Sequence, residues 1–143
     1  GMPIQIWKLR SMRHGAESKG VQWAQRDDPR ITAVGKWLRR LRIDELPQLF
    51  NVIAGDMSLI GPRPERPEID DVLEKDISHY RKRYWMRPGL SGWAQVCSPY
   101  AASVEEAELK LSYDLFYLCH FSTALDLLIL FKTIKTVLKA KGR

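Results

Sequence analysis

The sequence contains little cysteine and no long apolar run. Its two cysteines, Cys97 and Cys119, form no CxxC motif and have no histidine cluster beside them. This argues against a structural zinc site and against a disulfide-stabilised fold, and it fits a reducing compartment. No apolar stretch approaches the roughly 18 residues needed to span a bilayer, and no secretory signal is present. We therefore expect that the chain as given does not cross a membrane.

Two features of doubly wound nucleotide-binding proteins are also missing: βαβ alternation and a glycine-rich phosphate loop. The 143 residues are the usual size of one domain, and 45% hydrophobic residues with five tryptophans can supply a core. We predict a helix-dominated α+β fold over residues 1–143, with a few short strands and amphipathic interfacial helices.

The chain is basic, with a net charge of +6 and a pI near 9.5. This charge favours anionic partners such as nucleotides, nucleic acid or an acidic membrane surface. A predicted short helix near residues 34–41 brings four cations directly before an acidic pair: Lys36, Arg39, Arg40 and Arg42. They indicate charge balance around a bound anion, although a solvated cationic face is the alternative.

The segment from Asp44 to Pro64 has the highest density of candidate functional residues. Asp44 is a good helix N-cap, and Gly55 can end the helix. Apolar residues recur between them at helical spacing, at Leu46, Leu49, Phe50 and Ile53. A carboxylate at a helix N-terminus meets free N–H groups that also attract phosphate, so Asp44 and Glu45 can mark an anion site. The alternative is that Asp44 only caps the helix and Glu45 only occupies its first turn.

Two arginines lie beside prolines. In Gly61-Pro62-Arg63-Pro64, a proline on each side restricts the backbone, so the planar guanidinium of Arg63 is pre-oriented for phosphate oxygens. A solvated arginine in a surface turn is the alternative. Arg87, before Pro88, is a weaker candidate for the same role.

Periodicity predicts the other elements. These are a half-buried strand at 4–10, an amphipathic helix at 69–84, a short strand at 90–96, a helix opened by the capping box at 103–106 and a last helix from about residue 123. The last helix has broad apolar character and a basic stripe, which suits either an interfacial helix or a core helix with lysines facing water. That stripe comprises Lys132, Lys135 and Lys139, extended by Lys141 and Arg143.

Asp114 lies on the apolar stripe of the helix that begins after Ser103. A carboxylate on such a face needs a partner, so we expect it to pair with a buried arginine or lysine or to reach the active site. A partly exposed edge position is the alternative.

Taken in order, these motifs resemble the bacterial sugar transferase family, the monotopic phosphoglycosyl transferases that act as polyprenyl-phosphate hexose-1-phosphate transferases. The resemblance runs nearly end to end and rests on residues 7–12, 28–32, 44–48, 55–65, 87–89, 92–96 and 113–114. Residues 97–103, where many members read Asn-Gly-Arg, are more similar to the subgroup tied to exopolysaccharide export.

The resemblance implies transfer of a hexose 1-phosphate from a UDP-sugar to a polyprenyl phosphate, with release of UMP and a requirement for Mg²⁺. It implies that Asp44 is the nucleophile, that Glu45 completes the catalytic pair, and that Lys8, Arg39 and Arg63 bind phosphate, with Arg87 a weaker candidate. Asp114 matches a further, supporting position. Hard oxygen ligands suit Mg²⁺, so Asp44 and Glu45 are its expected protein ligands.

The same resemblance implies a place at the cytoplasmic face of the bacterial inner membrane, with the membrane surface as a partner. Family members carry an apolar membrane segment before the matched region, and this sequence does not include it. Two alternatives stay open: a basic nucleic-acid-binding module that stacks bases on Trp7, Trp23, Trp37, Trp85 and Trp93, and a non-catalytic scaffold fragment at a membrane surface.

Overall fold

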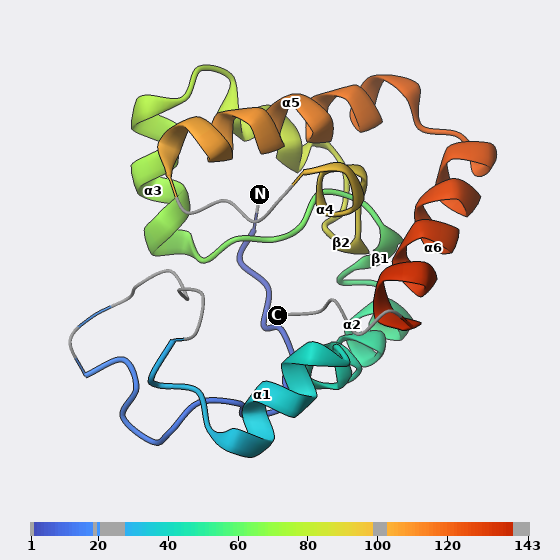
Figure 1. The fold of residues 1–143 in the computed structure, drawn as a ribbon. Helices are drawn as coiled ribbons and strands as arrows, with labels where there is room; N and C mark the ends of the chain where they lie inside the picture. Colours follow the sequence, from blue (N-terminus) through green and yellow to red (C-terminus); the bar gives the residue numbers. More distant parts are fainter. Residues whose placement is uncertain (1, 19, 21–27, 99–102, 139–143) are drawn as a thin grey trace.

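The computed structural model describes residues 2–18, 20, 28–98 and 103–138. Helices dominate that part of the chain, which confirms the predicted fold class (Figure 1). In chain order the elements are α1 (Ala33–Arg40), the 3₁₀ helix η1 (Ile43–Glu45), α2 (Gln48–Ala54), β1 (Ser58–Ile60), α3 (Pro67–Asp76), the 3₁₀ helix η2 (Tyr80–Trp85), β2 (Gly89–Ser91), α4 (Trp93–Cys97), α5 (Val104–His120) and α6 (Thr123–Leu138). Trp23, Lys139, Lys141 and Arg143 lie outside the described residues.

The strands β1 and β2 form a parallel pair in which Ser58 aligns with Gly89 and Ile60 aligns with Ser91. Figure 1 shows this small sheet between α2 and the layer formed by α4 and α5, with α6 beside it. The sheet therefore connects the part of the molecule that holds α1 and α2 to the part that holds α3 and α5.

Close backbone contact fixes the loop after β1. The N–H of Gly61 donates to the carbonyl of Ser91 at 2.9 Å, and the N–H of Gly89 donates to the carbonyl of Pro62 at 2.8 Å. A Cβ on Gly89 would lie 2.2 Å from the backbone nitrogen of Gly61. Glycine is required because two backbones meet here, and this contact determines where the chain enters the Arg63 loop.

Two hydrophobic clusters support the fold. One joins α3, η2 and α5 through the buried residues Leu73, Ile77, Tyr80, Ala107 and Leu111. The other joins β1, α5 and α6 through Ile60, Tyr117 and Ile129. The helix α5 contributes to both clusters and is the element on which the two halves of the core converge.

Several predicted elements agree with the structure. The helix α1 covers the predicted 34–41 region, and Gly55 ends α2 with a φ of 87°. Ser103 caps α5 by accepting a hydrogen bond from the N–H of Glu106 at 3.3 Å. The helix α6 begins at Thr123, as predicted.

The predicted strand at 4–10 is wrong. The segment is extended, but it pairs with no other strand in the described part of the chain. Its backbone instead bonds to the Asn51 side chain and to the carbonyl of Asp44. The alternation of apolar and polar residues indicates an extended chain, but it does not show whether that chain pairs with another strand.

The predicted helix at 69–84 is interrupted, and the predicted strand at 90–96 is mostly wrong. The helix α3 ends at Asp76, His79 has a φ of 64°, and η2 then turns the same apolar face to the same cluster. The helical spacing of apolar residues continues across the interruption because α3 and η2 face the same hydrophobic cluster. The strand β2 ends at Ser91, and the next residues form the short helix α4 against α5 and α6.

We expected the tryptophans to contribute to the core, and this prediction is wrong for three of the four tryptophans that the structure describes. Trp7, Trp37 and Trp85 are exposed, and Trp93 alone among the described tryptophans packs against a core cluster. Exposed tryptophans on a basic chain suit contact with a membrane interface or with nucleic acid bases.

We predict that Gly89→Ala lowers the free energy of unfolding by about 2 to 3 kcal/mol, because the added methyl group overlaps the Gly61 backbone. Gly15→Ala is the control: Gly15 has a φ of 73° but open space around it, so the cost is about 1 kcal/mol. Urea denaturation measures both changes. Equal losses for the two variants would contradict the close contact.

Candidate active site

Asp44 and Glu45 end the short 3₁₀ helix η1 between α1 and α2. The predicted role of Asp44 as the N-cap of the following helix is wrong, because Pro47 occupies the N-cap position of α2 and no side chain caps it. The preceding Arg42 has a left-handed conformation with a φ of 56°. Such a conformation is costly for a non-glycine residue and turns the chain so that both carboxylates face inward.

The extended segment before residue 12 brings Lys8 to the acidic pair. The N–H of Leu9 donates to the Asp44 carbonyl at 3.0 Å. The side chain of Asn51, buried in α2, accepts from the N–H of Trp7 at 3.1 Å and donates to the carbonyl of Gln5 at 2.7 Å. These bonds hold the segment on both sides of Lys8.

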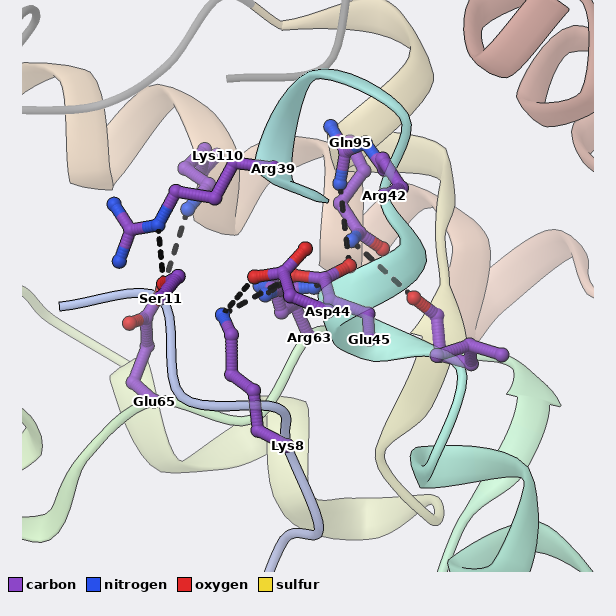
Figure 2. Close-up of polar contacts among 11 residues, drawn as sticks. Lys8, Ser11, Arg39, Arg42, Asp44, Glu45, Arg63, Glu65, Gln95 and Lys110 are labelled. Carbon is purple, nitrogen blue, oxygen red and sulfur yellow. Dashed lines mark hydrogen bonds and ion pairs between the residues drawn. The ribbon is translucent and has the colours of Figure 1, made fainter. Parts of the chain in front are cut away.

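Lys8 is shared by the two carboxylates. Its Nζ lies 3.2 Å from Oδ2 of Asp44 and 3.6 Å from Oε1 of Glu45, as Figure 2 shows. Asp44 is 3% exposed, so the ion pair lies at the edge of the protein interior. One cation can therefore be held by both acids at once.

Glu45 is surrounded by positive charge. Both oxygens of Glu45 accept hydrogen bonds from Arg63, and Nη1 of Arg42 lies 3.4 Å from Oε2. Burial opposes ionisation, but Arg63, Lys8 and Arg42 together lower the pKa of Glu45 to about 2. Glu45 is thus a fixed anion that gathers three cations from three segments of the chain.

On the side away from Glu45, a buried network holds the Arg63 loop; Figure 2 shows the Arg63 side chain next to Glu45. Nη2 of Arg83 donates to the backbone carbonyl of Arg63 at 2.7 Å and pairs with Asp114 at 2.9 Å. Nη1 of Arg83 donates to the hydroxyl of Tyr80 at 2.6 Å. The network anchors the Arg63 loop to α5 and η2.

Asp114 pairs with a buried arginine, as one of the sequence alternatives proposed, and among the described residues Arg83 connects it to the Arg63 backbone. Burial raises the pKa of Asp114 to about 6, although Arg83 and Lys110 act in the opposite direction. The carboxylate therefore supports the loop rather than facing Asp44.

The other two predicted cations lie apart from the carboxylates. Nε of Arg39 donates to Oγ of Ser11 at 2.8 Å, and among the described residues Arg39 forms no ion pair with Asp44 or Glu45 (Figure 2). Arg87 is exposed and bonds to the carbonyl of Gly55 at 3.4 Å, at the far end of α2. The structure thus brings Lys8 and Arg63 to the acidic pair, but not Arg87.

Sequence reasoning missed Asn51 and Arg83 as positioning residues. Asn51 gave one usable signal, because a carboxamide in the middle of a short helix needs a hydrogen-bond partner if it is buried. Arg83 had no distinct signal, because it follows Arg81 and Lys82 directly in a run of three cations.

The donor set around Asp44 and Glu45 contains two carboxylates. Within the described residues, no group of three or more histidine, cysteine, aspartate or glutamate side chains gathers as a metal site. A cage built only of protein ligands is therefore not present in that part of the chain. Two adjacent hard oxygen donors that already share a lysine cation do fit Mg²⁺ when substrate phosphates complete its coordination.

The fold and the site together define a class: a helix-dominated protein with a carboxylate pair, one buried and one partly buried, among cations, an arrangement suited to a phosphate-bearing ligand. Residues 1–140 match the family model described as "Bacterial sugar transferase". The chain belongs to this family.

Curated relatives agree with this assignment. The chain is 51% identical over 139 residues to the UDP-N-acetylgalactosamine-undecaprenyl-phosphate N-acetylgalactosaminephosphotransferase of Aeromonas hydrophila, covering 97% of this chain and 33% of the relative. It is 39% identical over 136 residues to the UDP-glucose:undecaprenyl-phosphate glucose-1-phosphate transferase of Escherichia coli K12, covering 94% of this chain and 29% of the relative. The chain thus spans about a third of the length of these proteins.

A further relative is shorter. It is the UDP-glucose:undecaprenyl-phosphate glucose-1-phosphate transferase of Caulobacter vibrioides, 44% identical over 140 residues, which cover 96% of this chain and 52% of the relative.

We predict a pH-dependent loss of stability that originates at Glu45. Its pKa in the folded protein is about 2, below the ordinary 4.5, so its contribution is present above pH 4.5 and is lost as the pH falls toward 2. The difference in free energy of unfolding between the wild type and Glu45→Gln should shrink by about 2 kcal/mol from pH 6 to pH 3. Urea denaturation at the two pH values measures it, and a constant difference would contradict the ion-pair assignment.

Proposed function

We propose that the protein transfers a hexose 1-phosphate from a UDP-sugar to a polyprenyl phosphate and releases UMP, as the first membrane step of exopolysaccharide or glycoconjugate assembly. The observation that carries this proposal is the buried Asp44 and the partly buried Glu45, which lie among Lys8, Arg42 and Arg63. Three cations against two carboxylates leave a positive excess for a diphosphate. The names of the relatives describe the same reaction class.

In the first step, a carboxylate oxygen of Asp44 attacks the phosphorus that bears the sugar. A bond forms between this oxygen and phosphorus, and the bond from phosphorus to the bridging oxygen breaks, so that UMP leaves with the electron pair. Asp44 suits the role of nucleophile because Lys8 is its one ion-pair partner within the described residues, whereas Glu45 is held by three cations.

In the second step, an oxygen of the polyprenyl phosphate attacks the same phosphorus. The bond between phosphorus and Asp44 breaks, the carboxylate is regenerated, and the product is a polyprenyl diphosphate sugar. Lys8 and Arg63 stabilise the charge on the phosphoryl oxygens in both steps, because they are fixed in a partly dry site before the substrate arrives. We assign Arg39, whose Nε donates to Ser11, to an outer phosphate of the substrate.

Mg²⁺ would be held by Asp44 and Glu45 together with phosphate oxygens. When bound, it supplies neutralisation of the charge on the diphosphate. Arg63, Arg42 and Lys8 lower the pKa of Glu45 to about 2, so its carboxylate keeps its negative charge over the physiological pH range.

The nucleic-acid-binding alternative is less well supported. The exposed Trp7, Trp37 and Trp85 could stack bases, but they belong to three different elements: the amino-terminal segment, α1 and η2. The alternative also does not explain why two carboxylates lie among the cations. Carboxylates repel the phosphate backbone of a nucleic acid. A non-catalytic scaffold likewise leaves the strained Arg42 turn without a function.

We propose a position at the cytoplasmic face of the bacterial inner membrane, and exposed apolar side chains on two helices support contact with a membrane surface. On α2, Phe50 is 70% and Ile53 is 83% exposed, and on α6, Phe131 is 67% exposed. Lys132 and Lys135 accompany the apolar residues of α6. A helix with this combination binds at the boundary of lipid headgroups and acyl chains. No helix in the described part of the chain is both long enough and apolar enough to span a bilayer.

We expect Asp44→Asn to abolish UMP release from UDP-hexoses in the presence of Mg²⁺ and polyprenyl phosphate. An amide cannot form the acyl phosphate, so the loss should be at least about a thousandfold. Mass spectrometry of the wild type, incubated with the donor alone, should find a phosphosugar on Asp44. Asp71→Asn, an exposed aspartate on α3, is the matched control. Undiminished turnover by Asp44→Asn would exclude Asp44 as the nucleophile.

We expect Ile53→Glu to weaken binding of the 143-residue chain to vesicles of anionic phospholipid by roughly tenfold, because a carboxylate replaces an inserted apolar side chain. Val72→Glu is the matched control, since Val72 is exposed on α3. Vesicle flotation measures the bound fraction. Equal effects of the two substitutions would show that net charge, rather than the α2 face, controls binding.

A further inference from the structure

A cavity of about 180 Å³ lies beside the acidic pair. Its walls come from η1, β1, β2, α4 and the second half of α6, and most of its lining residues are leucine, isoleucine or valine. Sites for whole drug-sized ligands are usually about 300 to 1,000 Å³, so this cavity suits one segment of a larger ligand.

The polar side chains in the apolar part of the cavity are already paired. The hydroxyls of Ser91 and Thr133 lie 2.6 Å apart, and the Thr133 hydroxyl also donates to the carbonyl of Ile129 at 2.8 Å. The hydroxyl of Thr136 donates to the carbonyl of Lys132 at 2.9 Å. A sugar or a nucleobase would find few free hydrogen-bonding groups there, whereas a hydrocarbon chain needs none.

One part of the cavity is polar. Arg42 and Glu45 line it together with Gln95, and Figure 2 shows the three side chains in one group. The Oε1 atom of Gln95 is buried and has no hydrogen-bond partner in the described structure. The cavity is therefore amphipathic, with a charged end that belongs to the candidate active site.

The apolar lining continues to the surface. Leu46, Leu59 and Leu130 line the cavity, and they are 54%, 49% and 41% exposed. Leu46 precedes α2 and Leu130 belongs to α6, so the cavity opens between the two helices that carry the exposed apolar residues. A ligand that fills it would meet cations at one end and an apolar surface at the other.

From this arrangement we infer that the cavity binds the isoprene units next to the phosphate of the polyprenyl phosphate acceptor. The phosphate lies toward Arg42 and the cations around Glu45, and the rest of the chain leaves between Leu46 and Leu130 into the lipid. This inference rests on the proposed function and adds to it a separate subsite for the acceptor chain.

The test is isothermal titration calorimetry of the native-length protein with farnesyl phosphate and, separately, with UMP. Two variants reduce the cavity from two different elements of its wall: Val137→Phe on α6 and Leu59→Trp on β1. Ile134→Phe adds the same side chain to an exposed position of α6 that does not line the cavity. We expect both cavity variants to raise the Kd for farnesyl phosphate roughly tenfold, with UMP binding within about twofold of the wild type.

Unchanged affinity for farnesyl phosphate in two folded cavity variants would overturn the inference. Weakened binding of UMP alone would also overturn it, because the cavity would then hold the nucleoside of the donor. A loss as large in Ile134→Phe would assign the effect to the helix surface and exclude the cavity. The titrations need no turnover, so they decide the acceptor subsite even if Asp44→Asn shows that the proposed transfer reaction is wrong.

Discussion

Ion pairing to Glu45 is the interaction on which the rest of the site depends. Lys8 comes from the extended amino-terminal segment, Arg42 from the turn after α1, and Arg63 from the loop after β1. Without that carboxylate, three cations would lie within a partly buried volume and repel one another. Burial of Glu45 is costly by itself, but the cations offset that cost and lower its pKa to about 2. The site is therefore assembled in advance of any substrate.

The position of the Arg63 loop depends on α5 and η2. The Arg63 loop has prolines on both sides, but prolines fix a local conformation and not the position of a loop in space. Position comes from Arg83, which bonds at once to the Arg63 carbonyl, the Tyr80 hydroxyl and Asp114. On the other side, Gly61 and Gly89 bring two backbones into contact. The guanidinium that pairs with Glu45 is thus constrained by the sheet and by the helical core.

The predictable part of the site is the local part. Asp44, Glu45 and Arg63 could be found because adjacent acids and a proline-flanked arginine are visible within twenty residues of sequence. The helix-dominated fold followed from periodicity and from missing βαβ alternation. Asn51 and Arg83 could not be assigned, because their partners are 46 and 20 positions away. The predicted strand at 4–10 is wrong for the same reason. Alternation shows that the chain is extended, but not which groups its backbone bonds to.

The apolar surface beside the candidate site suits the proposed acceptor. An acceptor with a phosphate head and a hydrocarbon chain has to place the head among buried charges while the chain stays out of water. A buried site deep in a core would require the hydrocarbon chain to cross polar protein, and a fully exposed site would lose the low-dielectric surroundings that strengthen the ion pairs of Asp44 and Glu45. Here the acidic pair lies in a 3₁₀ helix directly before α2, whose outward face is apolar. A turn of a few residues thus brings the candidate site next to an exposed apolar surface, which is what the proposed transfer to a polyprenyl phosphate requires.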